Sequence, residues 1–200
     1  MEPFRPTRGG GARAWLAATE ASLLRNLVGQ VLTLIAPENP ENPENPPDPP
    51  DQRGSDQRGD EIAALEALLP ASPADEAPAA PHDPVLARLL PDGYRDDPEA
   101  ASEFRRYTEP ALRSAKQQVA QQMLDTLPDA GGRIQLTQEQ AMAWLKALND
   151  VRLALGIRLG VTEDFEEQWG RLAQDDPKWS AFEVYAWLGA VQESLVQALA

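Results

Sequence analysis

The stretch Gly131-Gly132-Arg133-Ile134-Gln135-Leu136-Thr137 decides the fold, because it joins a glycine turn, a short strand and the start of a helix. Polar and apolar residues alternate from Arg133 to Leu136, as in a half-buried strand. Thr137 and Gln140 have the spacing of a capping box, in which each side chain bonds a free backbone N–H at a helix start. The helix that follows is expected to bury Trp144 and the apolar residues three and four positions further on.

The same order of features occurs near the N-terminus, in Gly9–Leu16. A short strand is expected over Arg13–Leu16, followed by a helix to about Ile35 with Thr19 as its N-cap. The two strands could pair and set their helices side by side. Residues 1–12 are interpreted as a flexible basic arm, and residues 13–35 as a strand and helix that pack on the main domain.

Residues 36–82 are predicted to be an acidic, proline-rich, disordered linker with a short helix at 61–69. Glu-Asn-Pro occurs three times over 38–46, and proline removes backbone donors while the charges have nothing to bury. A length-variable spacer is favoured over a ligand for a proline-binding module. Residues 36–100 hold sixteen acidic and four basic residues, so twelve of the fourteen net negative charges fall there.

The main helical domain is expected over residues 83–200. Asp83-Pro84 and Asp97-Pro98 each place a capping acid before a proline, which is a helix-start signal. Pro110 fits only the first turn of a helix, which predicts a new helix after the one at 98–107. The fold class is therefore all-α, a compact bundle of about five to seven helices, possibly with one short two-stranded β-ribbon.

Several classes of chemistry lack their residues. The chain has no cysteine and a single histidine, His82, in a Pro/Ala/Asp-rich stretch. We therefore expect no catalytic residue, no metal site and no cofactor. The protein is accordingly expected not to be an enzyme. The chain also has no run of eighteen apolar residues and no secretion signal, so we expect a cytoplasmic protein with no membrane contact.

Basic residues offer one set of candidate contacts for phosphate or an acidic partner: Arg5, Arg8, Arg105, Arg106, Arg113 and Lys116. The alternative is a solvated face with local ion pairs to Glu103 and Glu109. No segment is strongly basic and the net charge is −14, so contact with DNA is expected to be auxiliary at most.

The last helix offers a second candidate surface, formed by Val184, Trp187, Leu188, Val191 and Leu195. Apolar residues cover much of its circumference. Such a helix is either buried centrally or forms a seam with a partner or a second copy of the chain, which leaves a homo-oligomer possible.

Five blocks together resemble a known family: Glu103–Glu109, Gly131–Arg133, Ala147–Gly156, Val161–Asp164 and Val184–Gly189. The chain resembles the actinobacterial family of AosR-type oxidative stress transcriptional regulators. This family was formerly described only as a domain of unknown function. The resemblance covers roughly residues 1–35 and 85–200.

The resemblance implies a soluble, non-enzymatic regulator that works with the transcription machinery, through a sigma factor or RNA polymerase, in oxidative stress and cysteine biosynthesis. Sensing in the family depends on a thiol pair, which this chain lacks. Met123 and Met142 are expected to be core residues. The alternative function is an adaptor or scaffold for a protease or a metabolic complex, docking through the C-terminal helix.

Overall fold

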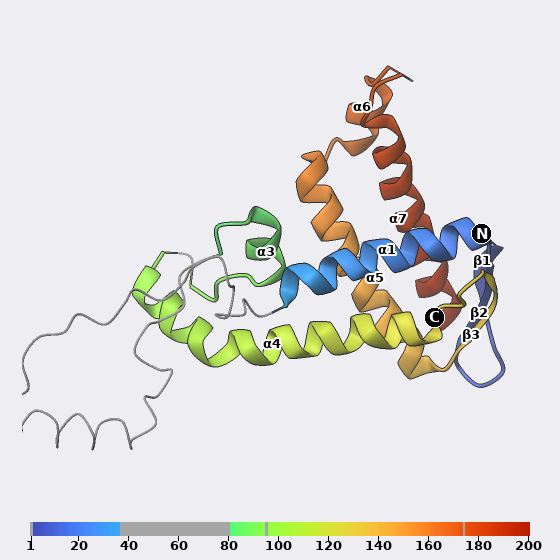
Figure 1. Cartoon of the computed structure of the whole chain (residues 1–200), viewed down its shortest axis with the longest axis horizontal. Helices are drawn as coiled ribbons and strands as arrows, with labels where there is room; N and C mark the ends of the chain where they lie inside the picture. The colour runs from blue at the N-terminus through green and yellow to red at the C-terminus, as the bar shows by residue number, and fades with distance from the viewer. Residues whose placement is uncertain (1, 37–80, 95, 174) are drawn as a thin grey trace, which may run out of the picture.

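The computed structural model describes residues 2–36, 81–94, 96–173 and 175–200. The described residues form a mainly helical fold with one small antiparallel sheet, as the fold class predicted (Figure 1). The elements are β1 (Glu2–Pro6), β2 (Ala12–Leu16), α1 (Ala18–Ile35), α3 (Pro84–Leu89), α4 (Pro98–Thr126), β3 (Gly132–Leu136), α5 (Gln138–Leu159), α6 (Phe165–Gly170) and α7 (Trp179–Leu199). Residues 37–80 of the linker predicted over 36–82, with its helix at 61–69, lie outside the described residues.

The sheet joins the two glycine-led strands, in the order β1-β2-β3. Strands β2 and β3 are antiparallel, with Ala12 opposite Leu136 and Leu16 opposite Gly132. The predicted strand pairing is therefore confirmed. Figure 1 shows the sheet at one end of the molecule, where α1 and α5 both begin.

Residues 2–6 form a third strand, so the prediction of a flexible arm over 1–12 is wrong for them. The reason is Phe4, which is 5% exposed and lies edge-to-face on Trp144 with ring centroids 5.8 Å apart. The backbone N–H of Phe4 also donates to Ser194 Oγ at 3.3 Å, which ties β1 to α7. Because of this anchor the expected two-stranded ribbon is a three-stranded sheet.

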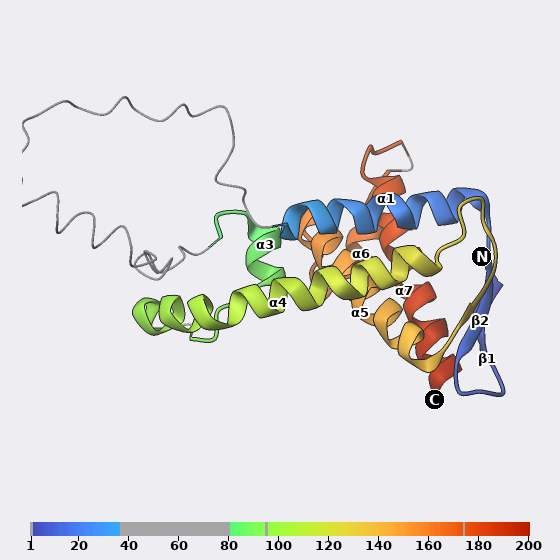
Figure 2. The same ribbon diagram turned by 60° about the horizontal axis from the view of Figure 1, so that its bottom comes forward.

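The core lies between the inner face of the sheet and the helices. Figure 2 shows α1 and α4 side by side, with α5 and α7 on their far side. Trp144 of α5 is fully buried at the centre, and its indole Nε1–H donates to Thr126 Oγ1 at 2.7 Å. A buried tryptophan N–H needs such a partner, so this bond fixes the end of α4 against α5.

The end of α5, the whole of α6 and the start of α7 project away from the sheet (Figure 1). Aromatic rings hold the tip of this projection together. Phe165 of α6 stacks on Phe182 at 5.7 Å and also contacts Tyr185 at 5.0 Å, both on α7. Trp169 packs against Trp179 at 5.7 Å. The tip is thus a small aromatic cluster of its own, separate from the main core.

Most of the predicted helix starts are confirmed. The carboxylate of Asp83 accepts from the N–H of Val85 at 2.7 Å, and that of Asp97 accepts from a first-turn N–H of α4 at 3.0 Å. Thr137 and Gln140 form the reciprocal capping box at the start of α5, with distances of 2.9 and 3.2 Å.

The start of α1 differs from the prediction. The N-cap is Ala17 rather than Thr19, which lies exposed in the first turn. The carboxylate of Glu20 accepts a hydrogen bond from the N–H of Ala17 at 2.7 Å. A glutamate at the third helical position can satisfy a free donor in this way without a hydroxyl at the cap, so the helix begins two residues early.

Pro110 lies inside α4, so the prediction of a new helix there is wrong. Its ring lies on the exposed side of a helix that runs unbroken over 29 residues. Figure 1 shows the first third of α4 bending away from the remainder, as expected where a proline removes one backbone bond. Packing against the neighbouring elements outweighs the local cost of the proline.

We predict that Gly11→Ala destabilises the protein by about 1–3 kcal/mol, the usual range for overpacking. A Cβ at Gly11 would lie 2.0 Å from the carbonyl oxygen of Leu136, and backbone cannot yield as a side chain can. Gly29→Ala in α1 is the control, because no atom lies within 4 Å of its added Cβ. Urea unfolding should show no loss for Gly29→Ala, and equal losses for both variants would contradict this account.

Candidate interaction surfaces

Arg113, one of the expected contact residues, holds two helices together. Its Nη1–H group donates to the carbonyl oxygens of Ile35 at 3.1 Å and Ala36 at 3.4 Å. These are final carbonyls of α1, where a cation also complements the helix dipole. Glu109 pairs with the same guanidinium at 2.6 Å. Arg113 is therefore an interhelical cap of α1.

Arg105 is buried, with its side chain 7% exposed. It pairs with Asp92, in the segment between α3 and α4, and its Nε lies 3.8 Å from Glu109 Oε2 on the same helix. A buried guanidinium must be paired in this way to offset its loss of hydration. Arg105 thus joins α4 to the preceding segment.

Lys116 forms the third internal contact. Its Nζ lies 2.6 Å from Asp150 Oδ1 on α5, and the two side chains are 17% and 8% exposed. The pair links the two longest helices of the described chain near their middle. Three of the six predicted contact residues are therefore engaged in internal ion pairs.

Arg106 remains at the surface of α4. Its guanidinium carbon lies 5.0 Å from the ring centroid of Tyr107, and Nη2–H donates to the tyrosine hydroxyl at 2.9 Å. Phe104 and Tyr94 are also exposed nearby and meet edge-to-face at 5.8 Å. This side of α4 is an exposed aromatic surface with limited positive charge.

The expected interaction helix belongs mostly to the core. Leu188, Val191 and Leu195 of α7 are at most 1% exposed, and Val184 and Trp187 are partly buried against the same core. The apolar stripe is covered because α7 packs on both α5 and β1. Of the two alternatives, the structure shows burial for Leu188, Val191 and Leu195, because α7 packs between two neighbours.

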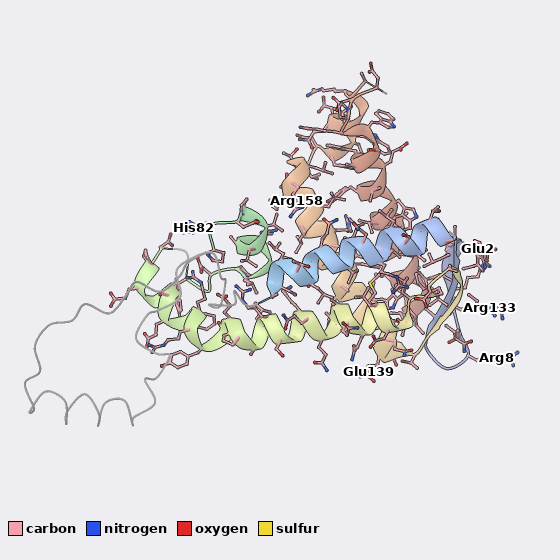
Figure 3. The ribbon with its side chains drawn as sticks, viewed as in Figure 1. Glu2, Arg8, His82, Arg133, Glu139 and Arg158 are labelled. Atoms are coloured by element: carbon pink, nitrogen blue, oxygen red, sulfur yellow. The ribbon has the colours of Figure 1, made fainter. Side chains whose placement is uncertain are left out.

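The outer face of the sheet is the remaining candidate surface. We call outer sheet face the exposed side chains that alternate with the buried ones on the three strands: Glu2, Arg5, Arg13, Trp15, Arg133 and Gln135. Arg5 lies opposite Arg13, and Trp15 lies opposite Arg133. Figure 3 shows Glu2, Arg8 and Arg133 at this end of the molecule, with Arg8 in the loop between β1 and β2.

The arginines of this surface have no ion-pair partner among residues 2–36, 81–94, 96–173 and 175–200. They are Arg5, Arg13 and Arg133, and the same holds for Arg8 in the adjoining loop. Trp15 beside them is 48% exposed. Arg13, Trp15 and Arg133 were not among the expected contacts, although the alternation in both strands carried the signal.

A shallow groove of about 400 Å³ lies between α4 and α5. Its lining combines apolar side chains with the internal ion pair: Leu112, Ala115, Lys116, Val119, Leu145, Lys146, Asn149 and Asp150. Lys116 and Asp150 both line the groove and pair with each other, so the groove carries no unpaired buried charge.

No group of three or more acidic or histidine side chains that could hold a metal ion occurs in the described part of the chain. His82 is exposed and lies at the start of the second described range (Figure 3). Among the described helices, none is long and apolar enough to cross a membrane.

Comparison with known proteins gives consistent matches over the whole chain. The family model described as "Domain of unknown function (DUF2017)" matches residues 1–199. "Oxidative stress regulator AosR" of Mycobacterium tuberculosis and of Mycobacterium bovis are both 38% identical over 200 residues, covering 94% of this chain and 81% of theirs. "Putative oxidative stress regulator AosR" of Mycobacterium leprae is 35% identical over 94% of this chain and 82% of its own. No solved structure matches the chain significantly.

We predict that Asp150→Ala lowers the free energy of unfolding by about 3 kcal/mol, since it leaves Lys116 unpaired and mostly buried. This loss is at the low end of the range for breaking a buried ion pair, because the Lys116 side chain is 17% exposed. Glu167→Ala is the control, because its pair with Arg171 is exposed and should contribute less than about 1 kcal/mol. Urea unfolding of both variants tests this, and equal losses would contradict it.

Proposed function

The chain belongs to the DUF2017 family, and from its relatives within it we propose that it is a non-enzymatic regulator in the oxidative stress response that contacts a protein of the transcription apparatus. The proposed partner is a sigma factor or RNA polymerase, met in the cytoplasm. The observation that carries the proposal is the 38% identity to proteins named oxidative stress regulator, which extends over 94% of the chain.

The distribution of charge supports a protein contact over a direct hold on DNA. Arg105, Arg113 and Lys116 are engaged inside the molecule. Because neutralised phosphates supply most of the affinity for DNA, the loss of three candidate cations in a chain of net charge −14 weakens that mode. DNA contact, if present, remains auxiliary to a protein contact.

The proposed regulator does not respond to oxidants through its own thiols, because the chain contains no cysteine. Of the two internal methionines, Met123 is fully buried, whereas Met142 is 45% exposed, so the expectation that both are core residues is wrong for Met142. Oxidation of this one exposed thioether would give a sulfoxide at the surface, without the cross-link that a thiol pair forms. We therefore propose that oxidants act on the partner or on the amount of this protein in the cell.

We predict that the immobilised full chain captures RNA polymerase or a sigma factor from native cell extract, and that peroxide does not change the yield. Mass spectrometry identifies the bound proteins, and gel filtration with the purified candidate then tests direct binding. An unrelated protein of equal size and net charge, immobilised at the same density, is the control for charge-driven capture.

Two outcomes would contradict the proposal. Enrichment of a protease or a biosynthetic enzyme without any transcription protein would indicate an adaptor or scaffold for such a complex. Capture that is abolished by peroxide treatment of this chain alone would contradict the absence of an intrinsic oxidant response.

A further inference from the structure

We propose that the outer sheet face binds an acidic segment of a protein partner, in which carboxylates flank an apolar or aromatic side chain. Arg5, Arg13 and Arg133 would receive the carboxylates, and Trp15 the apolar side chain. The partner is the one in the proposed function, and its chemistry is specified here. This inference rests on the proposed function only in that the partner is a protein.

The outer sheet face carries an electrostatic cost within the sheet. Arg5 and Arg13 are Cα partners in the antiparallel pair of β1 and β2, and both side chains are exposed on the same face. Like charges directly opposite each other destabilise a sheet. A bound carboxylate between the two guanidinium groups would turn this repulsion into two charge-assisted hydrogen bonds.

Trp15 and Arg133 form the neighbouring pair, as Cα partners across β2 and β3. Tryptophan and arginine are enriched in protein interfaces, and guanidinium groups bind carboxylates in a two-point geometry. The indole offers a large apolar surface that is 48% exposed. The two pairs together therefore place positive charge beside an apolar platform, with Arg133 opposite Trp15 on β3 and Glu2 opposite it on β1.

The outer sheet face lies on a rigid backbone. The side chains that alternate with those of the outer sheet face are packed into the core: Phe4, Ala12, Ala14, Leu16, Ile134 and Leu136. The backbone beneath the arginines is therefore held in one conformation. A rigid surface loses little conformational entropy on binding, which favours association.

The size of the face indicates a peptide segment as occupant. Five-residue strands extend about 16 Å, and three strands are about 10 Å across from first to last. Such an area is well below that of a standard interface between folded domains, and suits a weak, transient contact. One extended or helical segment of the partner covers it.

Nucleic acid fits this face less well. Single-stranded nucleic acid is bound on sheets by two or three stacking aromatic side chains, whereas Trp15 is the one aromatic residue of the outer sheet face. A duplex carries about one negative charge per 1.7 Å, and the chain as a whole is at −14. A short acidic segment meets the arginines with far less repulsion from the remaining charges.

The test uses a fluorescein-labelled peptide of twelve residues, in which Asp and Glu alternate with Phe and Ser, and the full-length chain at low salt. Fluorescence anisotropy should show binding that Arg13→Gln combined with Arg133→Gln weakens by about tenfold, since each exposed charge pair contributes modestly. Trp15→Ala should also weaken it. Arg158→Gln removes one positive charge on α5, away from the sheet (Figure 3), and should leave it unchanged.

Two controls separate charge recognition from folding. The same peptide with Asn and Gln in place of the acids should bind at least tenfold more weakly, because the carboxylates are lost. Thermal melting by circular dichroism checks each variant, and removing a facing arginine should not lower the midpoint. If the double variant does not fold, Arg5→Gln with Arg133→Gln supplies the comparison, since Arg5 lies on the edge strand β1.

The proposal is overturned if the acidic peptide does not bind at micromolar concentration, if the double variant binds it equally well, or if a twelve-nucleotide single strand or duplex binds more tightly. Its failure differs from failure of the proposed function. Capture of RNA polymerase by the double variant as well as by the unchanged chain would overturn this inference alone. Capture of no transcription protein, with peptide binding intact, would overturn the proposed function alone.

Discussion

The backbone pairing of β2 with β3 brings together segments about 120 residues apart in the chain, and the arrangement of the helices depends on it. Both strands lead directly into long helices, so pairing the strands places the starts of α1 and α5 side by side. The approach is close enough that a Cβ at Gly131 would lie 2.6 Å from the backbone nitrogen of Ala18. Glycine is required there also because its φ is +76°.

That pairing gives the sheet two chemically distinct faces. The inner face anchors β1 through Phe4 and meets the buried Trp144, which is in turn held to the end of α4. Alternation along the strands then places Arg13 and Arg133 on the opposite side. Positive charge therefore has two different uses in this molecule: on α4 it joins helices to one another, and on the sheet it is left without internal partners.

Local signals in the sequence predicted the parts of the fold that are locally determined. Asp83, Asp97 and Thr137 mark helix starts because a capping side chain acts within three residues of its own position. Pro110 led to the wrong prediction of a helix boundary, because the free-energy cost of a proline inside a helix is outweighed by packing along α4. Residues 2–6 gave no alternation that predicts a strand, since that strand depends on the distant contact of Phe4 with α5 and α7.

The candidate surface was predictable only in part, because exposure and burial also depend on contacts between residues that are distant in the sequence. Exposure follows from the register of the sheet, so Arg13 and Arg133 could be found from the alternation of their strands once the strands were paired. The burial of Arg105 could not, because Asp92 reaches it only when the segment before α4 folds back. The names of the relatives support a regulatory role without indicating which face is used, and the unpaired charges of the outer sheet face support the proposal made here.

Hydrogen–deuterium exchange on the full chain, with and without its captured partner, determines whether the outer sheet face is the contact surface. The account predicts that the partner slows exchange in 2–16 and 132–136 together, because these strands form one surface. Slower exchange confined to the groove between α4 and α5, or to the aromatic tip of α6 and α7, with no change in the strands, would contradict it.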